Sequence, residues 1–527
     1  MSGTPPPGGA PVGDPPMGET PVGDPPVADP IASPPSAGRR RLAARGTLIN
    51  SGFQIGIGGL NMLRTVVVAG FLTTTDFGIW GIVLLTVAFA GVMKGAAIGD
   101  KYVQQSEEDQ ELAFQKAFTL DLIFAGLFFV LSCAVAPLLA LAYGQWELVA
   151  PALALSVVIP SSALHAPVWV FYRRMDFLRQ RLVLSVDPIA SFVVTIALAA
   201  AGLGYWSLVL GVVSGSIVGA VVAMAMAPIR PRLVYDRGTM WEYVNFSWPL
   251  VIAAGGGILM GQLSLLLGNA ALGLAAAGAI ALASSIAIWT DSIDRIITQT
   301  LYPAICRVVD RKELLLETFT KSNRLTLLWG MPFGVALALF APDLVDFGIG
   351  DKWDEAVVLL QVFGLSAAIN HIGFNWDAFY RATGRTRPVM FVSLTGIFTL
   401  LGVGGPLLFV NGLDGYAIGV ATMTVVTLVL RWHFIRRFFP GFPIARYIAR
   451  AIAPTVPAVA AVLAIRLLAS GERTASLAAI EVATYLVATV AATLILERGL
   501  LRESIGYLRR RGPGAPAPEL SPSGSGG

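Results

Sequence analysis

The chain has 527 residues, of which 55% are hydrophobic and only 13% are charged, whereas soluble domains carry roughly 25% charged residues. Its mean hydropathy is +0.70. A soluble protein of this length could not cover its surface with so few charges, so the composition excludes a soluble enzyme. The net charge of +4 has to be interpreted by its distribution across a membrane, and it gives no reason to expect a nucleic-acid partner.

Both ends of the chain are predicted to lie outside the fold. Residues 1–38 contain 12 of the 33 prolines, and residues 512–527 are similarly rich in Pro, Gly and Ser. Such segments bury too little apolar surface to become ordered. The N-terminal segment also lacks the basic and apolar regions of a signal peptide. We expect a disordered Pro/Gly-rich tail at 1–46 and a basic, then disordered, tail at 498–527.

The chain between the tails predicts an all-α polytopic membrane protein. A transmembrane helix needs about 20 mostly apolar residues, and fourteen such stretches follow one another with short connections. The predicted spans are 47–71, 77–98, 117–142, 148–172, 182–202, 205–228, 244–268, 272–301, 325–349, 355–380, 388–410, 413–435, 447–469 and 475–496.

The distribution of basic residues predicts the orientation of these spans. With an even number of spans both tails lie on one side, and 31 of the 37 Lys and Arg residues fall on that side. Only Lys352, Arg466 and Arg473 fall on the opposite side, and three more lie within spans. Because basic residues concentrate on the cytoplasmic side of membrane proteins, both termini are predicted to be cytoplasmic.

Short motifs recur about 200 residues apart. Phe171-Tyr172-Arg173 ends the fourth span and Phe379-Tyr380-Arg381 ends the tenth, while Phe77-Gly78 in the second span parallels Ala277-Gly278 in the eighth. Six spans separate the copies, so both have the same orientation and are related by an axis along the membrane normal. This pattern predicts a two-lobed 6+6+2 arrangement. Its parts are an N-lobe at 47–228, a C-lobe at 229–437 and two additional helices at 438–497.

Polar side chains within the spans define the candidate site, because ionisable groups inside a membrane are costly and usually functional. In the first span, Gln54, Asn61 and Arg64 fall within one sector of the helix. Lys94 lies near the inner end of the second span. For both cations the alternative is that the side chain snorkels to the lipid headgroups.

The eighth and tenth spans carry a second polar set. Its members are Asp291, Asp294, Arg295, His371, Asp377 and Arg381. A histidine is a candidate for coupling transport to protons, although a packed histidine within a bundle is the commoner role. The alternative for Asp291 and Arg295 is a structural i,i+4 pair.

Motifs of soluble enzymes are absent from the sequence. It has no Walker sequence, no Ser-His-Asp set and no Cys-x-x-Cys, and its two cysteines and three histidines have no metal-ligand spacing. We therefore expect no enzyme activity, no cofactor and no metal. Glycines in the first and seventh spans are predicted to allow bending during transport. They are Gly56, Gly58, Gly59, Gly255, Gly256 and Gly257.

Three motifs together resemble a known family. Gly350–Leu360 has the pattern G-x-x-W-x-x-A-x-x-L-L, Ala378–Arg385 ends in A-x-G-R, and Arg173–Phe177 has the pattern R-R-x-D-F. In this order and spacing, over about residues 45–440, the chain resembles the polysaccharide exporter and O-antigen (Wzx-like) flippase family. That family belongs to the multidrug/oligosaccharidyl-lipid/polysaccharide (MOP) superfamily.

The resemblance implies a MOP-type transporter in the bacterial cytoplasmic membrane. Such proteins move undecaprenyl-pyrophosphate-linked oligosaccharide to the outer leaflet for cell-surface polysaccharides such as lipopolysaccharide. Partners would be membrane lipid, a polysaccharide polymerase and glycosyltransferases, and the transporter would be a monomer. Arg64, Lys94 and Arg295 would then offer positive charge to the pyrophosphate. A lipid II flippase, a cation-coupled drug exporter of the same fold and a membrane glycosyltransferase or polymerase remain alternatives.

Overall fold

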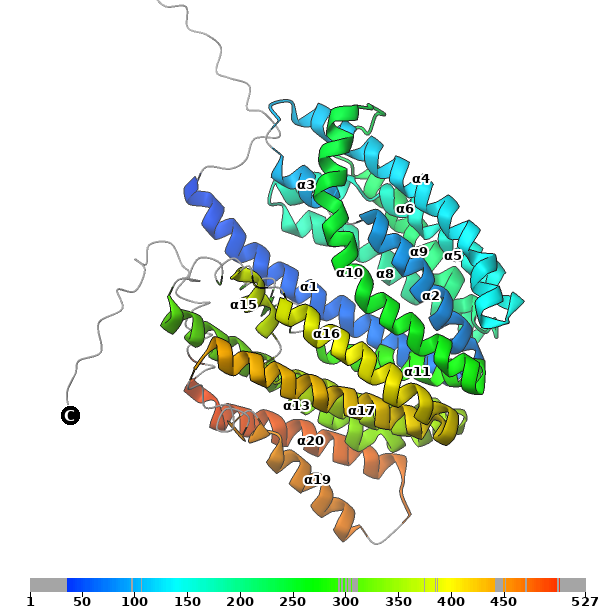
Figure 1. The fold of residues 1–527 in the computed structure, drawn as a ribbon, viewed down its shortest axis with the longest axis vertical. Coiled ribbons are helices and arrows are strands. Elements are labelled where there is room, and N and C mark those ends of the chain that lie inside the picture. The colour runs from blue at the N-terminus through cyan, green and yellow to red at the C-terminus, as the bar shows by residue number, and fades with distance from the viewer. Residues whose placement is uncertain are drawn as a thin grey trace, which may run out of the picture.

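The computed structural model gives an all-helical fold for the part of the chain that it describes. The described residues are 36–95, 98–105, 107–291, 294, 297–298, 301, 305, 311–373, 375–383, 385, 387–440, 449–450, 452–469, 472–499 and 502, without the side chains of 36–51, 89–95, 100, 104 and 245–259. Figure 1 shows α3 to α9 gathered on one side of the molecule and α13, α17, α19 and α20 on the other.

The helices follow one another along the chain with short connections. In the first half they are α1 (Ser36–Phe71), α2 (Thr74–Gly95), α3 (Ile98–Gln104), α4 (Gln110–Tyr143), η1 (Trp146–Leu148), α5 (Val149–Ser156), α6 (Val158–Ala163), α7 (Pro167–Arg173), α8 (Phe177–Ala200) and α9 (Trp206–Ala225). In the second half they are α10 (Arg237–Leu272), α11 (Leu274–Ala287), η2 (Ile288–Asp291), α13 (Lys312–Leu344), η3 (Val345–Ile349), η4 (Asp351–Ala356), α14 (Val357–Asn370), α15 (Trp376–Ala382), α16 (Arg387–Thr399), η5 (Leu400–Gly404), α17 (Gly405–Phe438), α19 (Val456–Leu468) and α20 (Ala475–Leu496).

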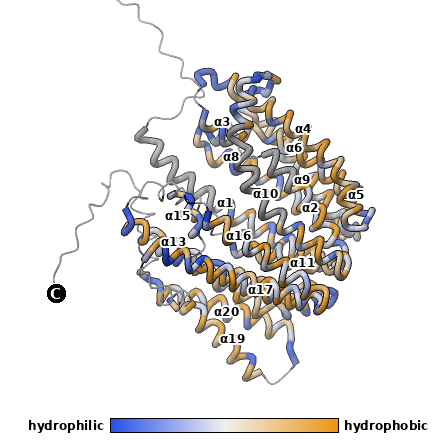
Figure 2. The backbone as a smooth tube through the Cα atoms, in the orientation of Figure 1, coloured by the Kyte–Doolittle hydropathy of each residue, from blue (hydrophilic) through white to orange (hydrophobic). Residues whose placement is uncertain are grey.

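The helices have the length and composition of a multi-pass membrane protein. Within the described residues, nine helical segments are long and apolar enough to cross a membrane, and three shorter helices are also apolar. Figure 2 shows hydrophobic colouring along α4 and α20 and hydrophilic colouring near α3. The all-α polytopic fold is therefore confirmed, whereas the count of fourteen spans and the orientation of the termini stay predictions.

Several predicted spans are interrupted helices. The stretch 148–172 is divided among α5, α6 and α7, and the stretch 355–380 is broken between α14 and α15, where Gly373 has a φ of 70°. In the stretch 272–301, the α-helix changes to the 3-10 turn η2 after Ala287. Hydropathy could not show these breaks, because it measures transfer into lipid and not the backbone conformation of the transferred segment.

Helix α1 begins at Ser36, before the predicted boundary at residue 46. Its first turns are rich in Arg, Leu and Ala, which favour helix whether or not the segment can enter lipid. The predicted break between the fifth and sixth spans is confirmed, because Gly202 and Gly204 have φ values of 81° and 54° between α8 and α9.

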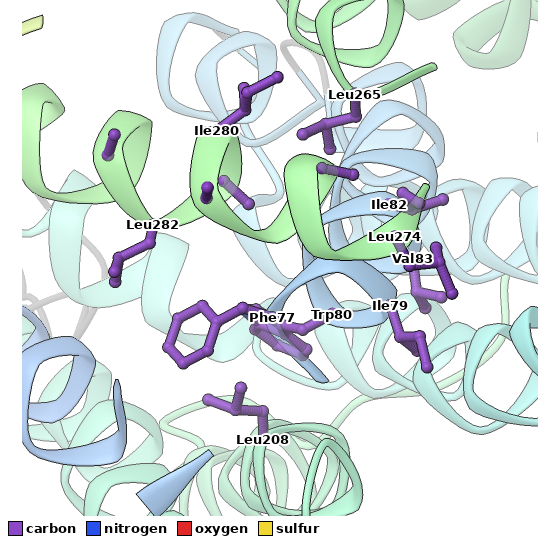
Figure 3. Packing of buried hydrophobic residues seen from close by; sticks show 14 of the residues in the cluster. Phe77, Ile79, Trp80, Ile82, Val83, Leu208, Leu265, Leu274, Ile280 and Leu282 are labelled. Carbon is purple, nitrogen blue, oxygen red and sulfur yellow. The ribbon is translucent and has the colours of Figure 1, made fainter. Parts of the chain in front are cut away.

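The two halves of the chain meet where α2 crosses α11. A Cβ placed on Gly78 would lie 2.1 Å from the carbonyl oxygen of Leu274, and one on Gly278 would lie 1.8 Å from the carbonyl oxygen of Thr74. These positions are the ones that the sequence repeat pairs, and their contacts are reciprocal. Around the crossing, Phe77 and other large side chains of α2 pack with residues of α11 (Figure 3).

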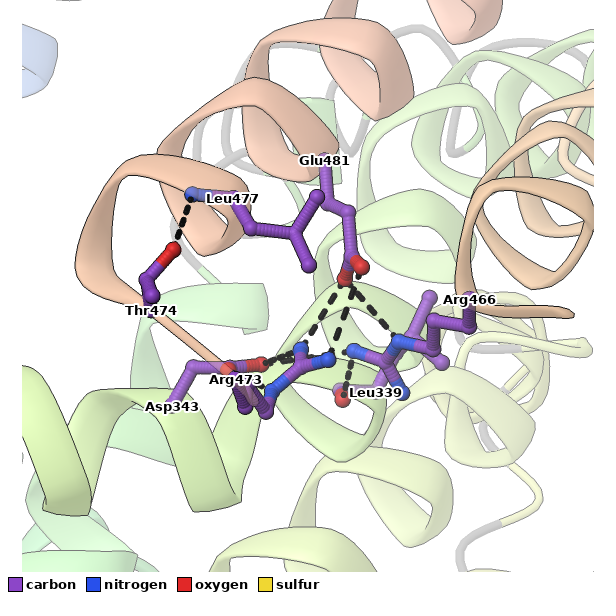
Figure 4. A network of polar contacts seen from close by, with 7 residues as sticks. All are labelled: Leu339, Asp343, Arg466, Arg473, Thr474, Leu477 and Glu481. Carbon is purple, nitrogen blue, oxygen red and sulfur yellow. Dashed lines mark hydrogen bonds and ion pairs between the residues drawn. The ribbon is translucent and has the colours of Figure 1, made fainter. Parts of the chain in front are cut away.

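A network of ion pairs attaches the α19–α20 hairpin to α13. Glu481 is fully buried and accepts from Arg466 at 2.9 Å and from Arg473 at 2.9 Å. Both arginines also bind Asp343 of α13 (Figure 4). Farther along α20, the hydroxyl of Tyr485 donates to the carbonyl oxygen of Pro332 at 2.8 Å. Two of the three cations that the sequence places on the side with few basic residues, Arg466 and Arg473, are therefore paired in the fold.

The α2–α11 crossing should not tolerate a side chain. We expect Gly78→Ala and Gly278→Ala each to lower the free energy of unfolding by about 1–3 kcal/mol, because the added methyl groups would press on backbone carbonyls. The thermal midpoint of the purified protein in detergent measures this loss. Gly126→Ala is the matched control, since a Cβ at Gly126 of α4 meets nothing within 4 Å. Equal midpoints for Gly278→Ala and Gly126→Ala would contradict the close crossing.

Candidate functional site

A cavity of about 830 Å³ lies among α1, α2, α8, α10 and α11. Gln54 and Asn61 of α1 line it, and Arg181 of α8 is a cation in its wall. The substrate-binding role predicted for Gln54 and Asn61 stays a prediction. Trp80 of α2 and Trp289 of η2 add aromatic surface. The lining thus combines amide, guanidinium and indole groups, which are the groups that bind the hydroxyls, phosphates and ring faces of glycans.

One of the predicted bending glycines contacts an aromatic wall residue of this cavity. A Cβ on Gly58 would lie 2.4 Å from the indole ring of Trp289, whereas Gly56 and Gly59 meet nothing within 4 Å. The absence of a side chain at Gly58 therefore lets Trp289 lie directly on α1. The role of these glycines in bending stays a prediction.

Beyond the cavity, the C-terminal end of α1 is covered by η4 from the other half of the chain. The indole of Trp353, which is fully buried, donates to the carbonyl oxygen of Ala69 at 2.9 Å, and its ring packs edge-on against Phe77 at 5.1 Å. Lys352 donates to the carbonyl oxygen of Gly70 at 2.8 Å. Partial burial lowers the pKa of Lys352, and the nearby Asp76 carboxylate opposes that shift.

The Arg64 guanidinium contacts a buried polar stripe on α8. It donates to the hydroxyl of Ser191 at 2.6 Å and lies within electrostatic range of Asp187. Arg64 is not among the described residues that line the cavity. Its part in substrate binding stays a prediction, and the structure gives it a second set of partners that the sequence did not indicate.

Three glycines of α9 let this polar stripe lie within the helix bundle. Gly211, Gly215 and Gly219 recur every four residues and pack on Thr195, Ser191 and Asp187 of α8, so that a Cβ at any of the three would lie within 2.9 Å of these residues. Small residues at this spacing let two membrane helices approach closely. The glycine spacing and the matching polar spacing on α8 were the available sequence signals for this contact, and the sequence analysis missed both.

The remaining predicted site residues do not line this cavity in the part of the chain that the structure describes. The side chain of Lys94 and the whole of Arg295 lie outside the described residues, as does the packing around Gly255, Gly256 and Gly257. Asp377 and Arg381 of α15 form an i,i+4 ion pair at 3.0 Å with partly exposed side chains.

His371 and two aspartates come together at the break after α14. The ring nitrogen Nε2 of His371 lies 3.1 Å from Asp294 and 3.9 Å from Asp291, and it also faces the carbonyl oxygen of Thr290 at 3.0 Å. The other nitrogen, Nδ1, faces the carbonyl oxygen of Ala367 at 2.6 Å. Carbonyl oxygens only accept hydrogen bonds, so this geometry favours a ring protonated on both nitrogens and paired with Asp294.

The three side chains also have the chemistry of metal ligands, and their ligand atoms lie within 4.8 Å of one another. A metal would need a bare nitrogen on His371. Both ring nitrogens face acceptors instead, and the ring rests on Gly330, where a Cβ would lie 2.3 Å away. The arrangement suits an imidazolium–carboxylate pair better than a metal centre.

Comparisons with known proteins find similarity to proteins of polysaccharide biosynthesis. A family model described as "Polysaccharide biosynthesis protein" matches residues 67–358. The succinoglycan biosynthesis transport protein ExoT of Rhizobium meliloti is 23% identical over 60% of this chain and 64% of its own length. The lipopolysaccharide biosynthesis protein WzxC of Escherichia coli is 23% identical over 60% of this chain and 65% of its own length. The matched region thus spans less than two thirds of these relatives.

Solved structures identify the fold. The lipid II flippase MurJ has a TM-score of 0.63 at 12% identity, covering 87% of this chain and 99% of the other. An inward-facing multidrug resistance MATE family transporter of the MOP superfamily has a TM-score of 0.59 at 12% identity, covering 74% of this chain and 99% of the other. The MOP-type transporter fold expected from the sequence is thereby confirmed.

The His371–Asp294 ion pair should contribute more to the free energy of unfolding than an exposed ion pair does. We expect Asp294→Asn to lower the free energy of unfolding by about 1–3 kcal/mol, because it removes the nearer of the two carboxylates beside a buried charged ring and leaves only Asp291, at 3.9 Å. Asp377→Asn, which removes the partly exposed partner of Arg381, should change it by about 0.5 kcal/mol or less. Thermal midpoints of the two purified variants test the difference. A larger loss in Asp377→Asn would contradict the assignment of the buried ion pair.

Proposed function

Because this chain belongs to the polysaccharide biosynthesis protein family, we propose that it translocates polyprenyl-pyrophosphate-linked oligosaccharide across the bacterial cytoplasmic membrane by alternating access. ExoT and WzxC, its curated relatives, are named for transport or biosynthesis of succinoglycan and lipopolysaccharide. The observation that carries the proposal is the cavity between the two halves, which has a polar and aromatic lining and lies next to the crossing of α2 and α11.

The proposed topology has fourteen spans and cytoplasmic termini. In this orientation α1 ends and α2 begins at the outer surface, so the Trp353–Ala69 contact and the α2–α11 crossing form the outer closure. The cavity is then open toward the cytoplasm, where lipid-linked precursors are made. The N-lobe at 47–228, the C-lobe at 229–437 and the helices at 438–497 would be the moving parts. The protein would work as a monomer beside a polymerase and glycosyltransferases.

The proposed substrate contacts follow the chemistry of the cavity wall. Arg181 would bind the pyrophosphate, because a guanidinium donates paired hydrogen bonds to phosphate oxygens. Gln54 and Asn61 would bind sugar hydroxyls, and Trp289 would stack on a sugar ring. Arg64, Lys94 and Arg295 remain the further cations proposed for the pyrophosphate. The polyprenyl tail would stay in the lipid.

Transport of lipid-linked sugar by the purified protein in proteoliposomes tests this proposal. We expect Arg181→Gln to lower the rate of translocation at least about tenfold, because one charge-assisted hydrogen bond contributes 1.5–3 kcal/mol. Gln54→Leu and Asn61→Leu should each lower it severalfold. Thr422→Val is the matched control, since Thr422 is half-buried on α17, away from the cavity lining, and its hydroxyl donates to the carbonyl oxygen of Ile418 in its own helix.

The same assay separates the alternatives. Translocation of a peptidoglycan precursor in place of the oligosaccharide lipid would assign a lipid II flippase. Extrusion of cationic dyes without flipping of either lipid would assign a drug exporter. Normal translocation by Arg181→Gln at equal protein level would overturn the proposed role of the cavity cation.

A further inference from the structure

A groove of about 340 Å³ lies along the last turns of α17 and shares no described lining residue with the central cavity. Its wall combines one aliphatic side chain with an indole, an imidazole and two guanidinium groups, all of them exposed. The lining residues are Val429, Trp432, His433, Arg436 and Arg437. The sequence analysis gave the basic residues at this end of α17 no role beyond orienting the spans.

Two more arginines at this end of the fold belong to the start of α16. Arg385 precedes α16, Arg387 is its first residue, and both are exposed. Arg385 and Arg437 both lie within electrostatic range of Tyr380 in α15, so the start of α16 and the end of α17 are close together. Helix α16 also packs along α17 (Figure 1). We define the basic patch as Arg385, Arg387, His433, Arg436 and Arg437.

The arginines of the basic patch lack the anionic partners that other arginines of the fold have. Arg324 pairs with the buried Glu497, and Arg381 pairs with Asp377. Within the residues that the structure describes, none of the patch arginines forms an ion pair or donates a side-chain hydrogen bond. Like charges gathered in one place repel one another. The basic patch therefore has the electrostatics of a site that an anion completes.

Exposed apolar side chains lead to the basic patch along both helices. On α17 they recur at intervals of seven, four and three residues, which places them on one face of the helix. They are Ile418, Val425, Val429 and Trp432. On α16 they follow Arg387 at intervals of four, three and four residues, and they are Phe391, Leu394 and Phe398.

The two apolar faces end at the same place. Phe391 of α16 contacts Phe434 of α17, with ring centroids 6.3 Å apart. One turn before Phe391 lies Arg387, and just after Phe434 lie Arg436 and Arg437. Each helix thus changes from apolar to basic at the end where the two meet. A phospholipid has the same order of chemistry, from acyl chains to phosphate.

The chemistry of the patch indicates the class of its ligand. Guanidinium groups donate paired hydrogen bonds to phosphate oxygens, and an indole favours the boundary between hydrocarbon and headgroups. Basic pockets between membrane helices suit anionic headgroups. A soluble phosphate would match only the arginines, whereas a lipid matches the arginines, Trp432 and the apolar faces together. We propose that the basic patch binds the phosphate of an anionic phospholipid, whose acyl chains lie along α16 and α17.

Quenching of Trp432 fluorescence by brominated lipid tests the proposal, because bromine atoms on acyl chains quench only an indole that they contact. The full-length protein would be placed in phosphatidylcholine nanodiscs that contain increasing fractions of brominated phosphatidylglycerol or, separately, brominated phosphatidylcholine. The emission of Trp432 is the difference between the parent protein and Trp432→Phe.

We expect half-quenching of this difference at a mole fraction of brominated phosphatidylglycerol at least about tenfold below that of brominated phosphatidylcholine, because several basic residues near the membrane surface each attract anionic lipid. Equal mole fractions for the two lipids would overturn the proposal and leave the patch to a soluble anion or an acidic protein.

Single substitutions in the patch locate the bound headgroup. Arg436→Gln and Arg437→Gln should each reduce the preference for phosphatidylglycerol about fivefold, because each removes one charge from the site. Arg237→Gln is the matched control, since Arg237 is also an exposed arginine but lies at the start of α10, which packs beside α3. It should keep the preference of the parent protein. An unchanged preference in both patch variants, or an equal loss in Arg237→Gln, would also overturn the proposal.

This inference goes beyond the proposed transport, and the quenching needs no lipid-linked sugar. Failure of the phospholipid site and failure of the transport proposal would therefore be seen in separate experiments. A protein that flips lipid-linked sugar but shows no preference for phosphatidylglycerol at Trp432 would lose this inference and keep its proposed function.

Discussion

In the hydrocarbon of a bilayer, each polar group of the backbone and side chains has to find its partner within the protein. The interrupted helices of this fold depend on that constraint. At the break after α14, the amide of Asn375 donates to Ser322 at 2.8 Å and accepts from Asn323 at 2.6 Å, and all three residues are buried. The neighbouring helix α13 thus satisfies the polar side chain that stands at the break.

The motifs that resemble the polysaccharide exporter family satisfy the same constraint at helix ends. Arg173 donates to the carbonyl oxygens of Tyr102, Val103 and Gln105, at distances of 2.9, 2.9 and 3.0 Å, where α3 ends. Trp353 covers the end of α1, as described above. Short sequence motifs can therefore mark this fold without touching a substrate, because they close the ends of helices that would otherwise leave carbonyl groups unpaired.

Much of the fold could be predicted from the sequence, because hydropathy shows which segments are long and apolar enough to span the bilayer. The polar sector of α1 is also visible in the sequence, and two of its members, Gln54 and Asn61, line the cavity. The sequence alone does not single out Asp187 and Arg181, because their importance depends on which helices lie beside α8. The neighbours of α8 are set by tertiary packing, and the glycine spacing of α9 is the one sequence signal that indicates them.

The reciprocal contacts of α2 and α11 have a consequence for the symmetry of the molecule. Gly78 approaches the carbonyl oxygen of Leu274, and Gly278 approaches that of Thr74. Leu274 and Gly278 stand 200 positions after Thr74 and Gly78, so the two contacts are equivalent. Such mutual contact of equivalent positions defines an isologous interface, the type found between the subunits of a two-fold dimer. The two halves are thus joined at this crossing as two identical subunits would be. Under the proposed alternating access, a rotation about the crossing would move both halves equally, so neither would serve as the fixed frame for the other.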